Sequence, residues 1–213
     1  MRRFVLLFVV SGFLASLPAI AAPGRALGVV ERADGAKLGG AVIASGSTVF
    51  AGDSFSTEGG GSLRARLGSV QLVLLSGTSV TLSGDPHAIN ANLIHGTAGF
   101  VSTAREFAME VPGATIRPKS SEPTEARVTV VGPNEAVVSS LRGALEVNAN
   151  GETYSIAEGT TYRLLTSAEQ ERQGAGAHPA MRNHTALEIV AGVTGAAFAV
   201  WGIQEVFESP VKP

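Results

Sequence analysis

The sequence predicts an all-β protein in which short stacked strands form a roll or solenoid-like body, followed by one C-terminal hydrophobic helix. Three observations predict it. The 213 residues include 26 glycines, and valine, serine and threonine recur throughout, a mix that favours short strands joined by tight turns. The long Glu, Lys and Leu runs of helix bundles are missing. The chain is 45% hydrophobic, and its length fits one cored domain with appendages.

Composition excludes several classes of protein. The chain has no cysteine, which excludes disulfides, thiolate metal sites and cysteine nucleophiles. The chain has 16 basic and 18 acidic residues, and removal of Arg2 and Arg3 with a leader would make its net charge more negative. No basic stripe is visible along the sequence, so nucleic acid is not an expected partner.

The N-terminus, residues 1–21, predicts a removable signal peptide. Arg2-Arg3 forms a basic start, residues 4–17 are apolar, and Pro18 ends the apolar run. Ala19-Ile20-Ala21 then supplies the small-x-small pattern of a cleavage site. The alternative is an uncleaved anchor, but the apolar run is shorter than the ~20 residues that a spanning helix needs.

A β domain is expected over residues 27–166. Alternating apolar and basic residues over 63–67 indicate a half-buried strand, and the continuously apolar run 70–75 indicates a strand covered on both faces. In order, the short β-type runs fall at residues 27–31, 41–44, 48–50, 63–67, 70–75, 79–82, 98–101, 107–111, 115–117, 126–131, 136–141, 144–148, 153–156 and 161–165.

Glycine-containing signals separate these runs. Gly52-Asp53 predicts a turn, Gly59-Gly60-Gly61 a flexible tip, and residues 118–124 an exposed loop. Asn150-Gly151 lies between two β-type runs, and both residues tolerate positive φ, so they predict a tight hairpin.

A weak internal echo accompanies the strands. The run around Gly96 resembles the run around Gly143, and the run around Gly113 resembles the run around Gly159, at nearly the same offset. Two matches at one offset suggest duplicated strand–turn units stacked on each other. Chance similarity between strands rich in glycine and threonine is the alternative.

Beyond the β domain, residues 167–185 predict a polar linker and residues 186–207 a hydrophobic helix. The uncharged part of that helix, residues 189–203, would span only about 22 Å of a hydrocarbon core of roughly 30 Å. Ala191, Gly195 and Ala199 fall on one helix face, as in close helix packing within lipid. Spanning the membrane is the favoured reading, and docking on the β body is the alternative.

Candidate chemistry is sparse. His87 and His95 lie in the β domain with Asp85 near the first, but their spacing matches no metal-ligand pattern. Asp53 follows a glycine in a turn, where a carboxylate typically caps backbone amides. The three glycines at 59–61 lack the Lys-Ser/Thr and helix of a phosphate loop. We therefore expect no enzyme, no catalytic, cofactor-binding or metal residues, and no cofactor.

Arg64, Arg66 and Arg105 are candidates for an anionic ligand surface. The alternative for the first two is the solvated face of an alternating strand.

Small motifs follow one another in a particular order, at residues 51–57, 63–70, 93–101, 109–116, 136–147 and 156–159. They include Gly52-Asp53 with Thr57 four residues after the aspartate, and a valine-rich run leading into Gly143. In order and spacing these motifs resemble the periplasmic FecR domain. That family's Gly-Thr-x-Phe-x-Val run is absent, and only three residues precede the first hydrophobic stretch, so no cytoplasmic sigma-regulating segment is expected.

The resemblance implies a non-enzymatic recognition or signal-relay domain, exported to the periplasm or cell envelope, that binds another envelope protein or a glycan. A structural envelope scaffold or assembly protein is the alternative. The C-terminal helix is the expected membrane contact.

The expected signal peptide predicts where the mature chain begins. We expect the exported chain to begin near Ala22, because cleavage should follow the small-x-small pattern. N-terminal sequencing of the exported protein measures this, and an intact Met1 would contradict it.

Overall fold

The computed structural model describes residues 25–165. The expected signal peptide, linker and hydrophobic helix lie outside the described residues. Between residues 25 and 165 all regular structure is β, and this part holds no helix that could cross a membrane. Its strands are β1 (Ala26–Leu38), β2 (Ala41–Val42), β3 (Thr48–Phe50), β4 (Ser54–Leu67), β5 (Val70–Leu74), β6 (Ser79–Asp85), β7 (Ala88–Ser102), β8 (Ala108–Val111), β9 (Ala114–Pro118), β10 (Thr124–Gly132), β11 (Glu135–Arg142), β12 (Leu145–Ala149), β13 (Glu152–Ile156) and β14 (Thr161–Leu165).

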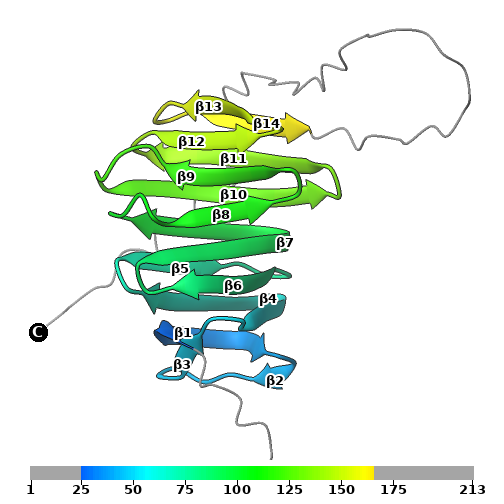
Figure 1. The fold of residues 1–213 in the computed structure, drawn as a ribbon. Helices are drawn as coiled ribbons and strands as arrows, with labels where there is room; N and C mark the ends of the chain where they lie inside the picture. Colours follow the sequence, from blue (N-terminus) through cyan, green and yellow to red (C-terminus); the bar gives the residue numbers. More distant parts are fainter. Residues whose placement is uncertain (1–24, 166–213) are drawn as a thin grey trace, which may run out of the picture.

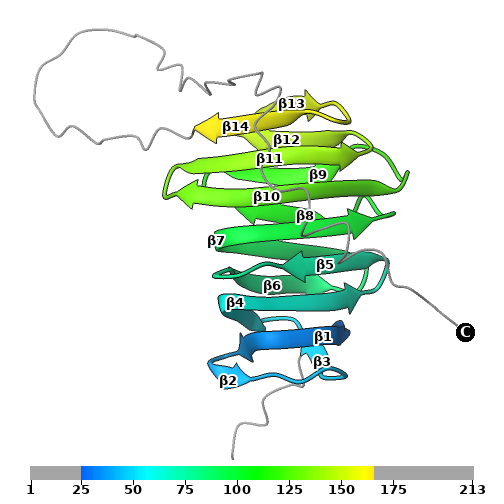
Figure 2. The same cartoon turned by 180° about the vertical axis from the view of Figure 1, so that it is seen from behind.

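The strands form one continuous sheet that is folded into two layers (Figure 1). Layer A faces the viewer in Figure 1 and contains β2, β6, β8, β9, β12 and β13. Layer B faces the viewer in Figure 2 and contains β5, β10, β11 and β14. Neighbouring strands are antiparallel except for β7 and β8, which pair in parallel. The all-β stacked body predicted from the sequence is therefore confirmed for the described residues.

Three long strands, β1, β4 and β7, belong to both layers. In β4, Ser54, Phe55 and Ser56 pair with β6, whereas residues 63–67 pair with β5. In β7, the first half pairs with β6, and the second half lies between β5 and β10. The prediction of uniformly short strands was wrong here, because these strands are 13 to 15 residues long.

Glycines mark the corners where the long strands pass between layers. The predicted flexible tip at Gly59-Gly60-Gly61 lies inside β4, at the corner of a continuous strand, so that prediction was wrong. The corresponding bend in β7 is at Gly96, whose φ is +88°. A Cβ built on Gly96 would lie 2.6 Å from both the carbonyl oxygen of Gly77 and the Cα of Thr78. Only glycine fits there, because the backbone is left-handed and has no space for a side chain.

Threonine hydroxyls close the same corner. The Oγ1 of Thr57 accepts from the amide of Thr78 at 2.9 Å and donates to the carbonyl of Leu75. The Oγ1 of Thr78 donates to the carbonyl of Thr97 and accepts from its amide, both at 3.0 Å. Thr97 in turn shares a 3.0 Å hydroxyl contact with Thr129. Thr57 and Thr78 are buried, so these bonds satisfy backbone groups that the bend removes from the sheet ladder.

The internal echo corresponds in part to the structure. Gly96 follows the β6–β7 hairpin and Gly143 follows the β10–β11 hairpin, and at each glycine the chain passes to the other layer. A Cβ on Gly143 would lie 2.9 Å from the hydroxyl of Thr124, as one on Gly96 would crowd Thr78. The second match is not equivalent, because Gly113 turns the β8–β9 hairpin, whereas Gly159 lies between β13 and β14.

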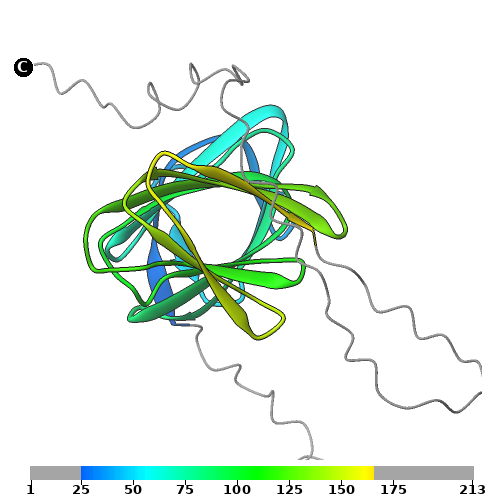
Figure 3. The same cartoon turned by 90° about the horizontal axis from the view of Figure 1, so that it is seen from above.

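The core fills the space that the ribbons enclose in Figure 3. Phe100 and Phe107 pack with ring centroids 4.7 Å apart. In β5, the inward Leu72 and Leu74 are fully buried and the outward Val73 is 1% exposed. The strand is therefore covered on both faces at Val73, whereas the outward Gln71 is only half-buried. Both ends of the predicted exposed loop over residues 118–124 are corrected, because Pro118 is the buried last residue of β9 and Thr124 is the buried first residue of β10.

The predicted hairpin at Asn150-Gly151 is confirmed. Ala149 pairs with Glu152 across it, and the two turn residues have φ values of +54° and +80°. Two positive φ values are what a two-residue turn between twisted strands requires.

Replacing Gly96 tests the corner. Gly96→Ala should destabilise the mature protein by about 3 kcal/mol or more, because left-handed strain adds to a clash with backbone atoms. Gly151→Ala is the matched control, since its φ is also positive but nothing lies within 4 Å of its Cβ position. It should cost only about 1 kcal/mol. Urea denaturation measures both, and equal losses would contradict the crowded corner.

Candidate functional site

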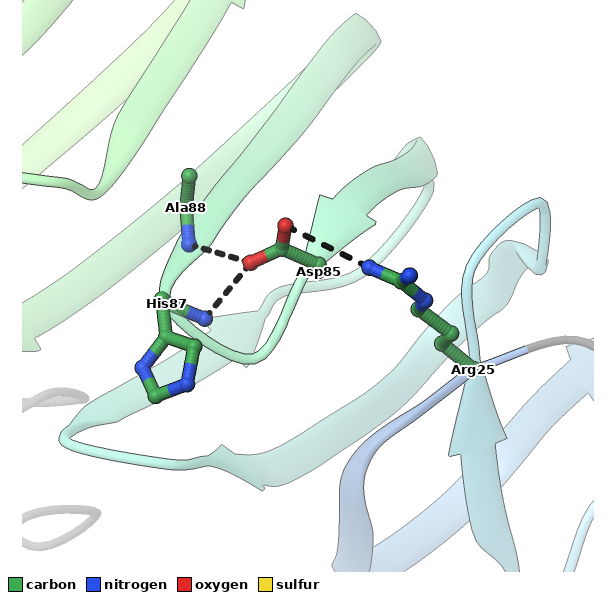
Figure 4. A network of polar contacts seen from close by, with 4 residues as sticks. All are labelled: Arg25, Asp85, His87 and Ala88. Carbon is green, nitrogen blue, oxygen red and sulfur yellow. Dashed lines mark hydrogen bonds and ion pairs between the residues drawn. The ribbon is translucent and has the colours of Figure 1, made fainter.

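Asp85, His87 and Arg25 form a polar network at the β6–β7 hairpin (Figure 4). One carboxylate oxygen of Asp85 accepts from the backbone amides of His87 at 2.8 Å and Ala88 at 3.1 Å. The other lies 3.6 Å from the guanidinium of Arg25. The hydrogen bond from the His87 amide is the largest influence on the pKa of Asp85, which lies below its ordinary value. The carboxylate therefore closes a turn and ties Arg25 to it.

The structure also shows where the other candidate residues, Asp53 and His95, lie and what they contact. Asp53 accepts from the amide of Phe50 at 2.8 Å, which confirms that it caps a turn. His95 pairs with Ser79 at the end of the β6–β7 hairpin opposite to His87, so the two histidines do not converge. Within residues 25–165 no group of three or more histidines and carboxylates could hold a metal ion.

The outer face of layer B brings together arginines that are far apart in the sequence. Registered pairs connect β1, β4, β5, β7, β10, β11 and β14 in a single line, and cross-strand partners project from the same side of a sheet. We call this line the arginine row, which consists of Arg32, Arg64, Val73, Gly99, Arg127, Ser139 and Thr161.

The centre of the arginine row is closely packed. Val73 is 1% exposed although it lies on the outer side of β5, and its partners across the sheet are Arg64 and Gly99. Gly99 has no side chain, so Val73 can be covered only by the aliphatic parts of long side chains near it, such as that of Arg64. The Nε of Arg127 is buried and has no hydrogen-bond partner among the described residues. Burial lowers the pKa of Arg127, and Glu125 partly opposes this effect.

Ion pairs flank the row on both sides. On one side, the Nε of Arg66 lies 2.5 Å from Glu31, which also accepts from Gln71 at 3.1 Å. Burial raises the pKa of Glu31, but the hydrogen bonds from Arg66 and Gln71 outweigh it, and the net direction is downward. On the other side, Arg163 lies 2.7 Å from Glu135.

The outer face of layer B is more basic than the domain as a whole. Six of the 11 lysines and arginines between residues 25 and 165 lie on it, against four carboxylates. The arginines are Arg32, Arg64, Arg66, Arg127, Arg142 and Arg163, and the carboxylates are Glu31, Asp34, Glu125 and Glu135. This excess of arginine arises from the register of several strands, so it is not visible as a basic stripe along the sequence.

Of the three arginines that the sequence suggested for an anionic surface, Arg64 lies in the row and Arg66 lies beside it. Arg105 lies in the segment between β7 and β8, outside the registered strand pairs that form the row. Sequence reasoning missed Arg32 and Arg127. The available signal was the position of Arg127 between two inward residues, Ala126 and Val128, combined with the hairpin register.

The outer face of layer A has different chemistry. A registered line across it has small polar side chains and a single carboxylate, Glu110, and no arginine or lysine. Two of its hydroxyls, those of Ser54 and Thr81, lie 2.8 Å apart. The whole line is Ser54, Thr81, Asn92, Glu110, Thr115, Asn148 and Thr153.

No protein-family model matches the chain, and no curated protein matches it. Two solved structures of a candidate anti-sigma factor from Parabacteroides distasonis ATCC 8503, at 1.65 and 2.50 Å resolution, are similar to it. Their TM-scores are 0.45 and 0.44, at 15% identity, over 53% of this chain and 54% of those chains. The chain thus matches about half the length of the solved chains, a likeness too low to assign a family or a function.

Proposed function

We propose that this chain is a non-enzymatic recognition domain of the cell envelope, which binds an envelope protein or glycan and relays that binding as a signal. The arginine row is the observation that carries the proposal. It is a preformed, charged surface on a rigid sheet, and its members are held by registered strand pairs. Binding domains typically place such groups on a rigid scaffold.

The sequence supports the proposed location. The signal peptide expected over residues 1–21 supports export, and the FecR-like order of motifs supports a periplasmic or envelope location and a role in signal relay. The hydrophobic helix expected over residues 186–207 would anchor the domain to the membrane.

A non-enzymatic role is supported by the structural hydrogen bonds of the candidate carboxylates and by the separation of the two histidines. The carboxylates of Asp53 and Asp85 accept hydrogen bonds from turn amides. His87 and His95 lie at opposite ends of one hairpin. General acid–base chemistry needs such groups to converge within hydrogen-bond reach of a substrate.

A structural scaffold or assembly protein is the second candidate. Among the described strands, β13 pairs with β12 alone and β14 with β11 alone, and at the other end β2 and β3 pair only with β1. These open ends of the folded sheet favour the scaffold. Such open edges can accept a further strand from another chain.

Site-specific photo-crosslinking tests the proposal. A photoreactive amino acid replaces Ser139, in the arginine row, or Asn148, on the outer face of layer A, in the full-length chain made in its own cells. Membranes are washed in alkaline carbonate first, so that retention of the chain reports anchoring by residues 186–207. We expect the Ser139 position to capture one envelope protein or glycan and the Asn148 position to capture much less of it.

Equal capture from both positions would favour the scaffold. Crosslinks to cytoplasmic proteins alone would contradict an envelope role.

A further inference from the structure

We propose that the outer face of layer B binds the anionic groups of a linear polysaccharide, with the arginine row as its contact surface. The inference rests on the recognition function proposed above and names the chemical class of the partner. It is carried by the charge, the packing and the spacing of the row.

Charge is the first argument. The arginine row contains three arginines and no carboxylate. The arginines at positions 66 and 163 are paired with Glu31 and Glu135, and Glu31 and Glu125 also attract Arg64 and Arg127. The six arginines of this face still outnumber its four carboxylates, and three of the six lie in the row. A guanidinium presents planar N–H donors that match carboxylate, sulfate and phosphate oxygens.

Packing is the second argument. Arg64 and Arg127 are half-buried against the sheet, so ligand binding immobilises less side-chain freedom than it would for fully exposed arginines. Burial removes the charge of Arg127 partly from water and so lowers its pKa, against the opposing effect of Glu125. The buried Nε of Arg127 has no acceptor among the described residues. An anionic oxygen near this guanidinium would offset that loss of hydration.

Spacing is the third argument. Adjacent strands lie about 4.8 Å apart, so Arg32 and Arg64 are separated by one such step. Arg64 and Arg127 are three strand steps apart, roughly 14 Å. A linear polymer lying across the strands would meet these cations in succession, whereas a single small anion could reach only one or two of them.

The surface chemistry favours a hydrated glycan over an acidic protein. The arginine row contains no aromatic residue, and neither does the adjacent line, which is Val29, Arg66, Gln71, Val101, Glu125 and Arg142. Hot spots of protein interfaces are enriched in tryptophan and tyrosine as well as in arginine. These two lines supply arginine without either aromatic residue, which suits a polymer whose charges remain hydrated between contacts.

Binding of defined polymers to the mature full-length protein tests the inference. The probes are polygalacturonate, which carries carboxylates, dextran sulfate, which carries sulfates, neutral dextran of matched length, and poly-L-glutamate as an acidic polypeptide. We expect the protein to bind at least one of the two anionic glycans at low salt, with an affinity that falls as the salt concentration rises. Its affinity for that glycan should be higher than its affinity for poly-L-glutamate. Neutral dextran should not bind.

Charge-matched variants locate the site. Arg32→Gln combined with Arg127→Gln should weaken glycan binding about tenfold or more, because two charge-assisted contacts are lost. The control combines Arg105→Gln with Arg117→Gln, which removes the same charge at positions outside the arginine row, and should change binding less than about twofold. Thermal unfolding confirms that each variant is folded. Arg32 is exposed, so Arg32→Gln alone, with a loss of about threefold, serves if the double variant does not fold.

Three results would overturn the inference. These are equal losses in the row and control variants, tighter binding of poly-L-glutamate than of either glycan, and no binding of any polyanion. None of them removes the proposed recognition function, which the capture of an envelope component from Ser139 tests separately.

Discussion

The fold depends on how its chain passes from one layer to the other without interrupting the sheet. Gly96 makes this passage within β7, where the backbone is left-handed and a Cβ would lie 2.6 Å from Gly77 and Thr78. The backbone groups that the bend removes from the ladder bond instead to the hydroxyls of Thr57 and Thr78. These two features are linked. Because Gly96 has no side chain, Thr78 can lie close enough to β7 for its hydroxyl to bond the backbone of Thr97.

Because the long strands serve both layers, the outer face of layer B is fixed to the core. Arg64 lies between inward residues Leu63 and Ala65 of β4, both of which are almost fully buried. A register slip of one residue would turn such arginines inward and their apolar neighbours outward. The arginine row is thus as well specified as the core itself, which suits recognition by a preformed surface. The line from Ser54 to Thr153 across the outer face of layer A shares that rigidity but has small, mostly uncharged side chains.

Local patterns predicted much of this architecture. Alternation over residues 63–67 placed Arg64 and Arg66 outside, and Asn150-Gly151 predicted its hairpin, because each signal is complete within a few residues. The glycines at 59–61 were misread as a tip, since a glycine bend within a strand and a turn between strands have the same local composition. The arginine row could not be predicted, because aligning Arg32, Arg64 and Arg127 requires the register of several strand pairs, and no single segment contains that information.

Native-state hydrogen exchange of the corner amides tests the account most directly. The amides of Thr78 and Thr97 donate to threonine hydroxyls at 2.9 and 3.0 Å instead of to a regular ladder. If the glycine corner and its threonines hold the two layers together, these amides should exchange only through global unfolding, as slowly as those of Leu72 and Phe100 in the core strands. Exchange within about tenfold of the unprotected peptide rate would show that the corner opens locally. A corner that opens in this way could not hold the two layers and their outer faces as one rigid body.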